Sequence, residues 1–205
     1  MEKLSLKDTE KAAEYLKQGK AICFPTDTVY GLAGTIETED GYDELVKIKK
    51  RPPEKPFTLM CASNEVAKSY LRKDPISEYI LDNFFPGQVT LIAEAKDNLP
   101  HWITLGTKYI GIRVPDFPSA QEILRLAGGA ALVTSCNHSG EAPITEPDEI
   151  IKVFDGEVAA IVYQEVPFNV PSTIVQVTDG KIKLIRQGKV PFETIEKGLK
   201  DHGLI

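Results

Sequence analysis

Short apolar runs alternate with amphipathic helix patterns along the chain, and this interleaving limits the folds that it can adopt. AICF (21–24), FTLMCA (57–62) and AALVTSCN (130–137) are typical of buried strands that end in polar loops. Residues 41–50 mix apolar and basic positions at helical spacing. Strands interleaved with helices favour an α/β fold, and a hairpin around Asp179-Gly180 would add antiparallel pairing. We therefore expect an α/β domain with a mixed sheet.

The remaining elements follow from the same patterns. Helices are expected from about Asp8, Asn64, Pro75, Ser119 and Pro147, and at residues 192–201. Further strands are expected at residues 88–95, 109–115, 158–163, 172–177 and 181–186. The 205 residues contain no internal repeat, low-complexity tract or clear linker, which predicts a single domain over residues 1–205.

The net charge of −6 limits how the chain can bind anions. An acidic protein cannot hold nucleic acid through a global positive field, so an anion site must come from a local basic cluster. One such cluster consists of Lys47, Lys49, Lys50, Arg51 and Lys55. These side chains are the first candidates for contacts with phosphate.

Other residue patterns exclude several classes of protein. Cys23, Cys61 and Cys136 lie far apart in apolar runs without C-x-x-C spacing, so we expect buried, reduced thiols. No H-E-x-x-H or similar metal motif occurs. The charged N-terminus does not resemble a signal peptide, and no apolar run approaches the roughly 20 residues of a membrane helix. We expect a cytoplasmic protein without a membrane partner.

The stretch FPTDTVYGLAG (24–34) is the first segment that could carry chemistry. A hydroxyl-rich loop is expected to follow the buried strand and to precede the glycine pair, and strand ends in α/β proteins are common ligand sites. Its threonines offer hydroxyl groups, while Gly31 and Gly34 allow close approach of the backbone. A turn stabilised by Asp27 and the threonines explains the same residues without a ligand, so the pattern alone leaves both interpretations open.

Two further segments carry cationic side chains. KKRPPEKP (49–56) places Lys and Arg at a helix end before a rigid proline-rich loop, which suits a polyphosphate. A solvated basic helix end is the alternative. Arg113 interrupts the apolar strand YIGIRVP (109–115), so its guanidinium group must reach a partner or solvent. A substrate carboxylate and a structural ion pair are both compatible with that position.

Two polar strand ends complete the set. TSCNHSG (134–140) opens from a buried strand into small hydrogen-bonding side chains, and alternation places Ser135 and Asn137 on one face. His138 lies in the same loop, where a lone histidine is more often solvated than catalytic. Ser172 begins a strand whose hairpin partner ends at Arg186, which is a weak signal by itself.

Together these five segments resemble the YrdC-like threonylcarbamoyl-AMP synthases from about residue 20 to residue 190. FPTDTVYGL is the most specific stretch of that family, and its K-x-R and S-x-N pairs are matched by Lys49, Arg51, Ser135 and Asn137. The order and spacing of all five segments agree. The resemblance implies a three-layer α/β fold with a twisted mixed sheet around a concave basic groove.

The resemblance also implies a role for each matched residue. The catalytic group would be Lys49, Arg51, Ser135 and Asn137. Threonine would be held by Thr28, Arg113, Ser135 and Ser172, with Arg113 on the carboxylate. ATP would be surrounded by Lys49, Arg51, Lys55, Tyr109, Asn137, Thr145 and Arg186.

The implied reaction joins L-threonine, bicarbonate or CO₂, and ATP into threonylcarbamoyl-AMP and pyrophosphate, for threonylcarbamoyladenosine modification of tRNA. Mg²⁺ would accompany ATP. The implied macromolecular partners are tRNA or double-stranded RNA and a tRNA-threonylcarbamoyl transferase complex that accepts the product.

Two alternatives stay open at this point. One is a double-stranded RNA-binding or tRNA-binding protein without catalytic activity. The other is a YciO-like paralogue with a different substrate, which FTLMC (57–61) and the lysine-rich proline loop resemble. That branch tends to lack the S-x-N pair, and its presence here favours the synthase.

Overall fold

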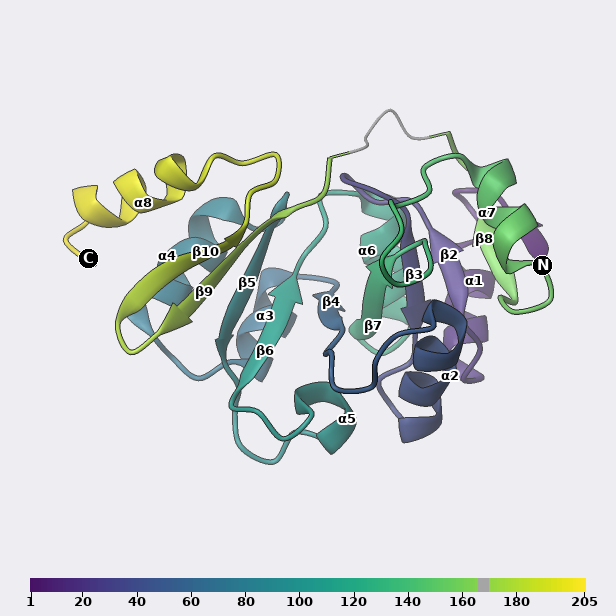
Figure 1. Ribbon diagram of the computed structural model, residues 1–205, viewed down its shortest axis with the longest axis horizontal. Helices are drawn as coiled ribbons and strands as arrows, with labels where there is room; N and C mark the ends of the chain where they lie inside the picture. Colours follow the sequence, from purple (N-terminus) through teal and green to yellow (C-terminus); the bar gives the residue numbers. More distant parts are fainter. Residues whose placement is uncertain (166–169) are drawn as a thin grey trace.

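The computed structural model describes residues 1–165 and 170–205, which form a ten-stranded sheet packed between helices (Figure 1). The strands are β1 (Glu2–Leu4), β2 (Ile22–Phe24), β3 (Gly31–Gly34), β4 (Thr58–Cys61), β5 (Val89–Glu94), β6 (Tyr109–Arg113), β7 (Ala130–Ser135), β8 (Ala160–Val162), β9 (Thr173–Thr178) and β10 (Lys181–Arg186). The helices are α1 (Thr9–Lys17), α2 (Glu39–Lys49), α3 (Asn64–Tyr70), α4 (Pro75–Phe84), α5 (His101–Thr104), α6 (Pro118–Leu126), α7 (Pro147–Phe154) and α8 (Phe192–Asp201).

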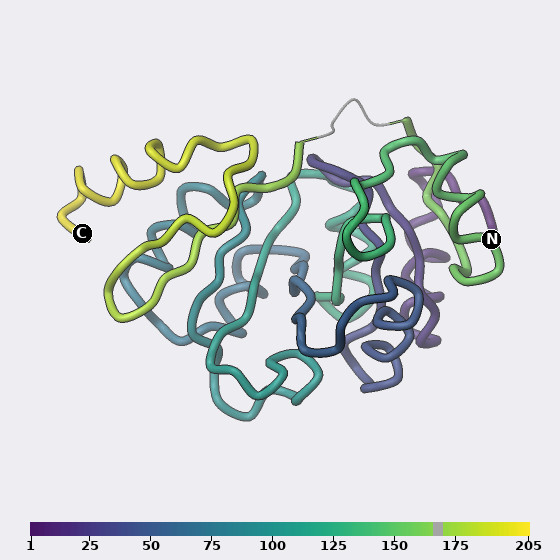
Figure 2. The backbone as a smooth tube through the Cα atoms, viewed as in Figure 1, coloured from purple at the N-terminus to yellow at the C-terminus, as the bar shows by residue number. Residues whose placement is uncertain are grey.

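The sheet mixes parallel and antiparallel pairs, which confirms the predicted fold class. Its strand order is β1-β8-β2-β3-β7-β4-β6-β5-β9-β10. Parallel pairs join β1 to β8, β2 to β8, β4 to β6 and β5 to β9, and the remaining neighbours are antiparallel. The two ends of the chain lie at opposite ends of the long axis (Figure 2).

Most predicted elements are confirmed within a few residues, but one strand in the candidate site region was not predicted. The hydroxyl-rich loop expected after Phe24 is present up to Tyr30, but Gly31–Gly34 forms strand β3, which was not predicted. Its two glycines weaken the local preference for strand, yet β3 is completely buried and pairs with β2 on one side and β7 on the other. Pairing on both edges therefore overrides composition. The short elements β1 and α5 were not predicted either.

Strand register gathers the polar residues of the central strands on one face of the sheet. Directly paired residues of neighbouring strands point to the same face of the sheet. The register pairs Gly31 with Ser135, Thr58 with Val133, and Met60 with Arg113. Ile112 pairs with Leu91, so their neighbours Arg113 and Thr90 point together to the opposite face. Polar side chains from the four neighbouring strands β7, β4, β6 and β5 thus converge on one side.

Two apolar clusters hold the layers together. One packs the apolar faces of α1 and α6 against β2, β3 and β7, through residues such as Leu16, Phe24, Ile123 and Val133. The other packs the remaining long helices against the sheet, through residues such as Leu45, Ile80, Phe154 and Leu199. Helices α1 and α6 cover one face of the sheet only near β2, β7 and β4. The same face of the sheet is therefore left open over β6 and β5.

Two further predictions concern the cysteines and the membrane. All three cysteines are buried and free, as expected, and the Sγ atoms of Cys23 and Cys136 lie 3.3 Å apart. Within residues 1–165 and 170–205, no helix combines the length and the apolar character that crossing a bilayer requires.

The close packing of β3 against α2 predicts that Gly34→Ala destabilises the fold. An added Cβ atom would lie 2.8 Å from Leu45 Cγ and 2.9 Å from the carbonyl oxygen of Gly41, both in α2. Since the carbonyl cannot move without displacing the helix, we expect the free energy of unfolding to fall by about 1–3 kcal/mol. Urea denaturation measures the change.

The matched control is Gly111→Ala in β6, where the nearest atoms to an added Cβ lie 3.8 Å away. This substitution should change the free energy of unfolding far less. Equal losses in the two variants would contradict the packing explanation.

Candidate functional site

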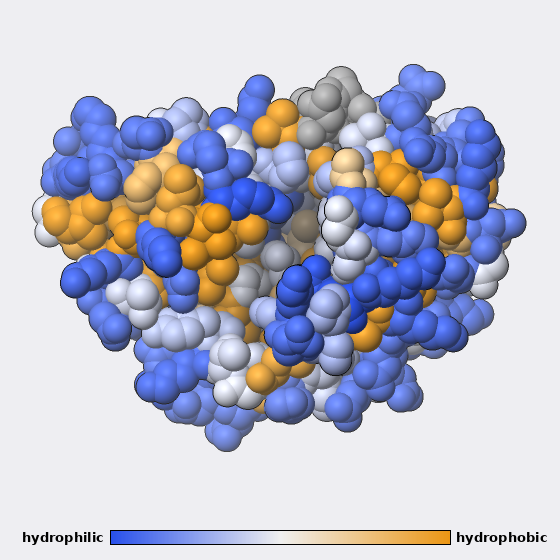
Figure 3. Space-filling model, viewed as in Figure 1, coloured by the Kyte–Doolittle hydropathy of each residue, from blue (hydrophilic) through white to orange (hydrophobic). Residues whose placement is uncertain are grey.

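A cavity of about 120 Å³ opens on the face of the sheet where the polar groups converge. The space-filling view is hollowed near its centre, between the two halves of the molecule (Figure 3). The walls come from β3, β4, β5, β6 and β7 and from the loops around residues 26–30, 51–57 and 171–172. Six residues singled out in the sequence line this cavity: Thr28, Arg51, Arg113, Ser135, Ser172 and Arg186.

The loop between β2 and β3 is braced by its own threonines. Thr26 Oγ1 donates to the carbonyl oxygen of Val29 at 2.6 Å and accepts the backbone N–H of Thr28 at 3.1 Å. The two threonine hydroxyl groups lie 3.1 Å apart, and both side chains are buried. This tight turn fixes the hydroxyl group of Thr28 at the cavity wall.

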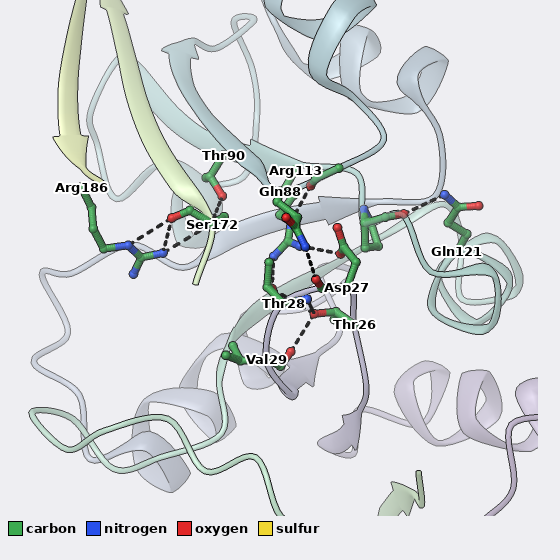
Figure 4. Close-up of polar contacts among 12 residues, drawn as sticks. Thr26, Asp27, Thr28, Val29, Gln88, Thr90, Arg113, Gln121, Ser172 and Arg186 are labelled. Carbon is green, nitrogen blue, oxygen red and sulfur yellow. Dashed lines mark hydrogen bonds and ion pairs between the residues drawn. The ribbon is translucent and has the colours of Figure 1, made fainter. Parts of the chain in front are cut away.

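Arg113 lies on the floor of the cavity, and three contacts hold it (Figure 4). Its Nε donates to the carbonyl oxygen of Gly87 at 3.1 Å, one terminal nitrogen donates to Thr28 Oγ1 at 2.7 Å, and the other donates to Asp27 Oδ1 at 2.5 Å. The side chain is only 5% exposed. Each terminal nitrogen carries a second N–H group, so the guanidinium keeps donor capacity for a bound anion.

The two interpretations of Arg113 left open by the sequence are therefore compatible with one another. Its ion pair with Asp27 is structural, while its position on the cavity floor leaves it able to bind a carboxylate.

A second group of polar contacts lies beside Arg113, where β9 begins. Ser172 Oγ and Thr90 Oγ1 are hydrogen-bonded at 2.8 Å, and Arg186 donates to the carbonyl oxygen of Ser172 at 2.9 Å (Figure 4). The bulge between Leu184 and Arg186 lets β10 turn at its end, where Arg186 reaches back to Ser172. The hairpin partners predicted from sequence thus meet at the cavity wall.

Lys49, Ser135 and Asn137 form a compact cluster beside the cavity. Lys49 Nζ donates to the carbonyl oxygen of Ser135 at 2.5 Å and to Asn137 Oδ1 at 2.7 Å. Ser135 Oγ donates to the same Asn137 oxygen at 2.5 Å. Asn137 also donates to the carbonyl oxygens of His138 and Glu141, so it folds the loop that follows β7.

The ammonium group of Lys49 is buried among neutral oxygens. Its side chain is 2% exposed, and no described carboxylate forms an ion pair with it. Burial lowers the pKa of Lys49 to about 8. An anion bound nearby would stabilise the protonated form.

Arg51 lines the cavity without touching the other three residues of the predicted catalytic group. Its Nε and one terminal nitrogen donate to the carbonyl oxygens of Lys55 and Pro56, at 3.0 and 2.9 Å. The guanidinium carbon lies 5.1 Å from the ring centre of Phe57. Burial lowers the pKa of Arg51, Arg113 and Arg186, because removal from water disfavours the charged guanidinium group.

Several sequence candidates lie outside the lining of the cavity. Lys49 and Asn137 lie behind Ser135, Lys55 is exposed, and Thr145 is partly buried in the loop after β7. Tyr109 bonds through its hydroxyl group to Thr178 Oγ1 at 2.7 Å. Their roles around ATP stay predictions.

His138 packs edge-on against the ring of Phe154, with 5.3 Å between ring centres, and does not line the cavity.

Two functional candidates were missed in the sequence. Asp27 was considered only as a turn residue, but its side chain pairs with Arg113, 86 positions along the chain. Thr90 was treated as one residue of an apolar strand, although a hydroxyl group at an alternating position marked a polar spot on that face. Only the pairing of β5 with β9 and β6 brings it to the cavity.

The cavity is built to hold an anionic ligand. Three arginines line it together with hydroxyl groups, and its lining contains no acidic residue among the described positions. Within residues 1–165 and 170–205, no group of three or more His, Cys, Asp or Glu side chains could hold a metal ion.

Comparison with protein families gives one match over most of the chain. The family model Sua5_yciO_yrdC, described as "Telomere recombination", matches residues 14–188. A threonylcarbamoyl-AMP synthase of Cellvibrio japonicus is 33% identical over 151 residues, which cover 73% of this chain and 80% of that protein.

Solved structures show the same fold. Sua5 of P. abyssi, determined with L-threonine, superposes with a TM-score of 0.89 at 27% identity and covers 97% of this chain. This chain spans 60% of that protein. YciO of E. coli superposes with a TM-score of 0.85 at 26% identity, and the alignment covers 95% of this chain and 97% of YciO.

The buried ammonium group predicts a pH-dependent cost at Lys49. Its pKa of about 8 in the folded protein lies below the ordinary value of 10.5, so folding disfavours the protonated form. The cost is fully present below pH 8 and disappears as the pH rises from about 8 toward 10.5. Over that range the stability of the wild type should rise by about 1–3 kcal/mol relative to Lys49→Met.

Urea denaturation at several pH values measures this difference. Lys47→Met, on the exposed side of the same helix, is the matched control and should show no such trend. If the free energies of unfolding of wild type and Lys49→Met differed by the same amount at every pH, the charge of Lys49 would not be buried as described.

Proposed function

Because the chain belongs to the Sua5_yciO_yrdC family, we propose that it is a threonylcarbamoyl-AMP synthase, a nucleotidyltransferase that uses L-threonine, bicarbonate or CO₂, and ATP. The product would be threonylcarbamoyl-AMP, with release of pyrophosphate. The observation that carries the proposal is the direct contact of Lys49 with Ser135 and Asn137 beside a cavity lined by arginines.

Threonine fits the part of the cavity around Arg113. The free N–H groups of its guanidinium can bind a carboxylate, and the hydroxyl group of Thr28 lies next to them. Ser172 and Thr90 offer further hydroxyl groups beside Arg113, where they can pair the amine or hydroxyl of the amino acid. Hydroxyl pairing would distinguish threonine from valine.

The phosphates of ATP fit beside the amino acid, where two further arginines line the cavity. Arg51 and Arg186 line it, and both are held by backbone oxygens that leave their charge uncompensated. The buried ammonium of Lys49 adds a positive charge behind Ser135. Mg²⁺ would arrive with the nucleotide as part of the substrate, held by phosphate oxygens and water, which suits a lining without carboxylates.

The reaction needs positioning and charge neutralisation more than a nucleophilic side chain. The threonine nitrogen forms a bond to carbon of CO₂ and loses a proton, which gives a carbamate. A carbamate oxygen then bonds to the α-phosphorus of ATP while the bond to the bridging oxygen breaks, and pyrophosphate leaves. Arg51, Arg186 and Lys49 would stabilise the negative charge that develops on the phosphates.

The product is a mixed anhydride that reacts with nucleophiles, so a tRNA-threonylcarbamoyl transferase complex is its proposed acceptor in threonylcarbamoyladenosine synthesis. Binding of tRNA or double-stranded RNA by this chain itself would depend on a local basic surface, because the net charge is −6. The likeness to E. coli YciO supports a second candidate, a paralogue that uses the same cavity for another substrate.

Threonine-dependent release of pyrophosphate from ATP tests the proposal. With bicarbonate present and no RNA, we expect turnover with threonine and at least about 100-fold lower kcat/KM with valine, because the hydroxyl partners would be left unpaired. A coupled pyrophosphate assay measures both rates.

The alternatives predict different results in that assay. A YciO-like paralogue would release no more pyrophosphate with threonine than without it. An RNA-binding protein would show no turnover and an affinity for double-stranded RNA that falls steeply with salt.

Removing one cation of the phosphate region should weaken catalysis. We expect Arg51→Ala to lower kcat/KM for ATP by about 100-fold, as the loss of one charged contact to a transition state typically does. Arg125→Ala, which removes an exposed arginine paired with Glu122, is the control and should keep wild-type kinetics. Unchanged kcat/KM in Arg51→Ala would refute its role.

A further inference from the structure

The three arginines that line the cavity differ in what holds them. Arg113 forms an ion pair with Asp27, with 2.5 Å between nitrogen and oxygen, and both side chains are more than nine-tenths buried. Arg51 and Arg186 are held by carbonyl and hydroxyl oxygens only. Among the described residues, no carboxylate forms an ion pair with either of them. One cavity therefore presents one neutralised and two uncompensated guanidinium groups.

Asp27 lies behind Arg113 and does not line the cavity. Its backbone carbonyl oxygen accepts a hydrogen bond from Gln88 Nε2 at 2.5 Å, which fixes the loop against the start of β5 (Figure 4). Its Oδ2 atom is buried and has no hydrogen-bond partner in the protein. The negative charge of this carboxylate is thus shielded from water and acts mainly on Arg113 and on whatever Arg113 binds.

We propose that Asp27 sorts the two anionic substrates between the arginines of the cavity. Paired with Asp27, Arg113 offers directed N–H donors with little net positive charge, which suits the carboxylate of a zwitterionic amino acid and disfavours a phosphate dianion. Arg51 and Arg186 keep their full charge for phosphate. The inference rests on the proposed function and adds to it a positioning and specificity role for Asp27.

The physical basis is that the two ligands differ in charge more than in hydrogen bonding. Carboxylate and phosphate both accept paired N–H groups from arginine. Phosphate carries nearly two negative charges, whereas an amino acid carries an ammonium group beside its carboxylate and has no net charge. A buried carboxylate near the site repels the first far more than the second. Specificity of this kind arises from repulsion of the wrong ligand.

Calorimetric titration of threonine in the presence and absence of inorganic phosphate tests the proposal without turnover. In the wild type, phosphate should leave the threonine Kd unchanged within about twofold. In Asp27→Asn, which keeps a similar shape but removes the charge, phosphate should raise the apparent threonine Kd by about tenfold or more. Asp27→Glu restores the charge and should restore resistance to phosphate.

Glu122→Gln is the matched control, because it removes a carboxylate from an exposed arginine pair outside the cavity. It should behave as the wild type does. The proposal is overturned if phosphate competes with threonine in the wild type, or if folded Asp27→Asn resists phosphate as the wild type does.

Asp27→Asn removes one partner of a buried ion pair, so its folding must be checked by circular dichroism. If it does not fold, steady-state kinetics of the wild type decide. Phosphate that competes with ATP and not with threonine supports the proposal, and phosphate that competes with threonine refutes it. A chain that neither binds threonine nor releases pyrophosphate would refute the proposed function itself. Threonine-dependent turnover together with phosphate competition at threonine would refute only the role of Asp27.

Discussion

The ion pair between Asp27 and Arg113 is the interaction on which the cavity depends. A charge on β6 that is 5% exposed needs a partner, and the chain supplies one from a loop 86 residues earlier. That loop precedes β3, and β6 is separated from β3 by β7 and β4, so the contact links the loop to β6 across the central strands. The carbonyl oxygen of Gly87, which accepts from Arg113, and the side-chain amide of Gln88, which donates to the carbonyl oxygen of Asp27, tie the start of β5 into the arrangement.

Lys49 differs from Arg113, because its buried charge has only neutral partners. Asn137 and Ser135 satisfy its N–H groups, yet they do not compensate the charge, and the pKa falls to about 8. A buried cation of this kind lowers stability in the absence of an anion. Its retention is reasonable where a substrate supplies the missing negative charge. Arg113, whose charge is neutralised by Asp27, thus has a zwitterion as its proposed ligand. Lys49, whose charge is uncompensated, lies near the proposed position of a polyphosphate.

Much of this arrangement could be predicted from the sequence, and the exceptions share one cause. Apolar runs and helix patterns located most elements, and alternation placed Ser135 and Asn137 on one face, where both contact Lys49. Strand β3 was missed because Gly31 and Gly34 carry no local strand signal, and its formation depends on β2 and β7 together. Asp27 and Thr90 were missed because their partners lie on distant strands. Contacts set by the order of strands are beyond what spacing along one chain can show.

The contrast between overall and local charge bears on the selectivity that we propose for the site. A net charge of −6 provides no general attraction for polyanions, so an anionic substrate gains only from the arginines and Lys49 at short range. Short-range recognition depends on the exact partners of each cation, which is why a single buried carboxylate can change what a neighbouring arginine prefers. The S-x-N pair acts in the same way on Lys49, because Asn137 holds the ammonium beside Ser135 rather than in solvent. A paralogue that lacks this pair could keep the fold and the cavity while losing the ordered cation that the proposed adenylate chemistry requires.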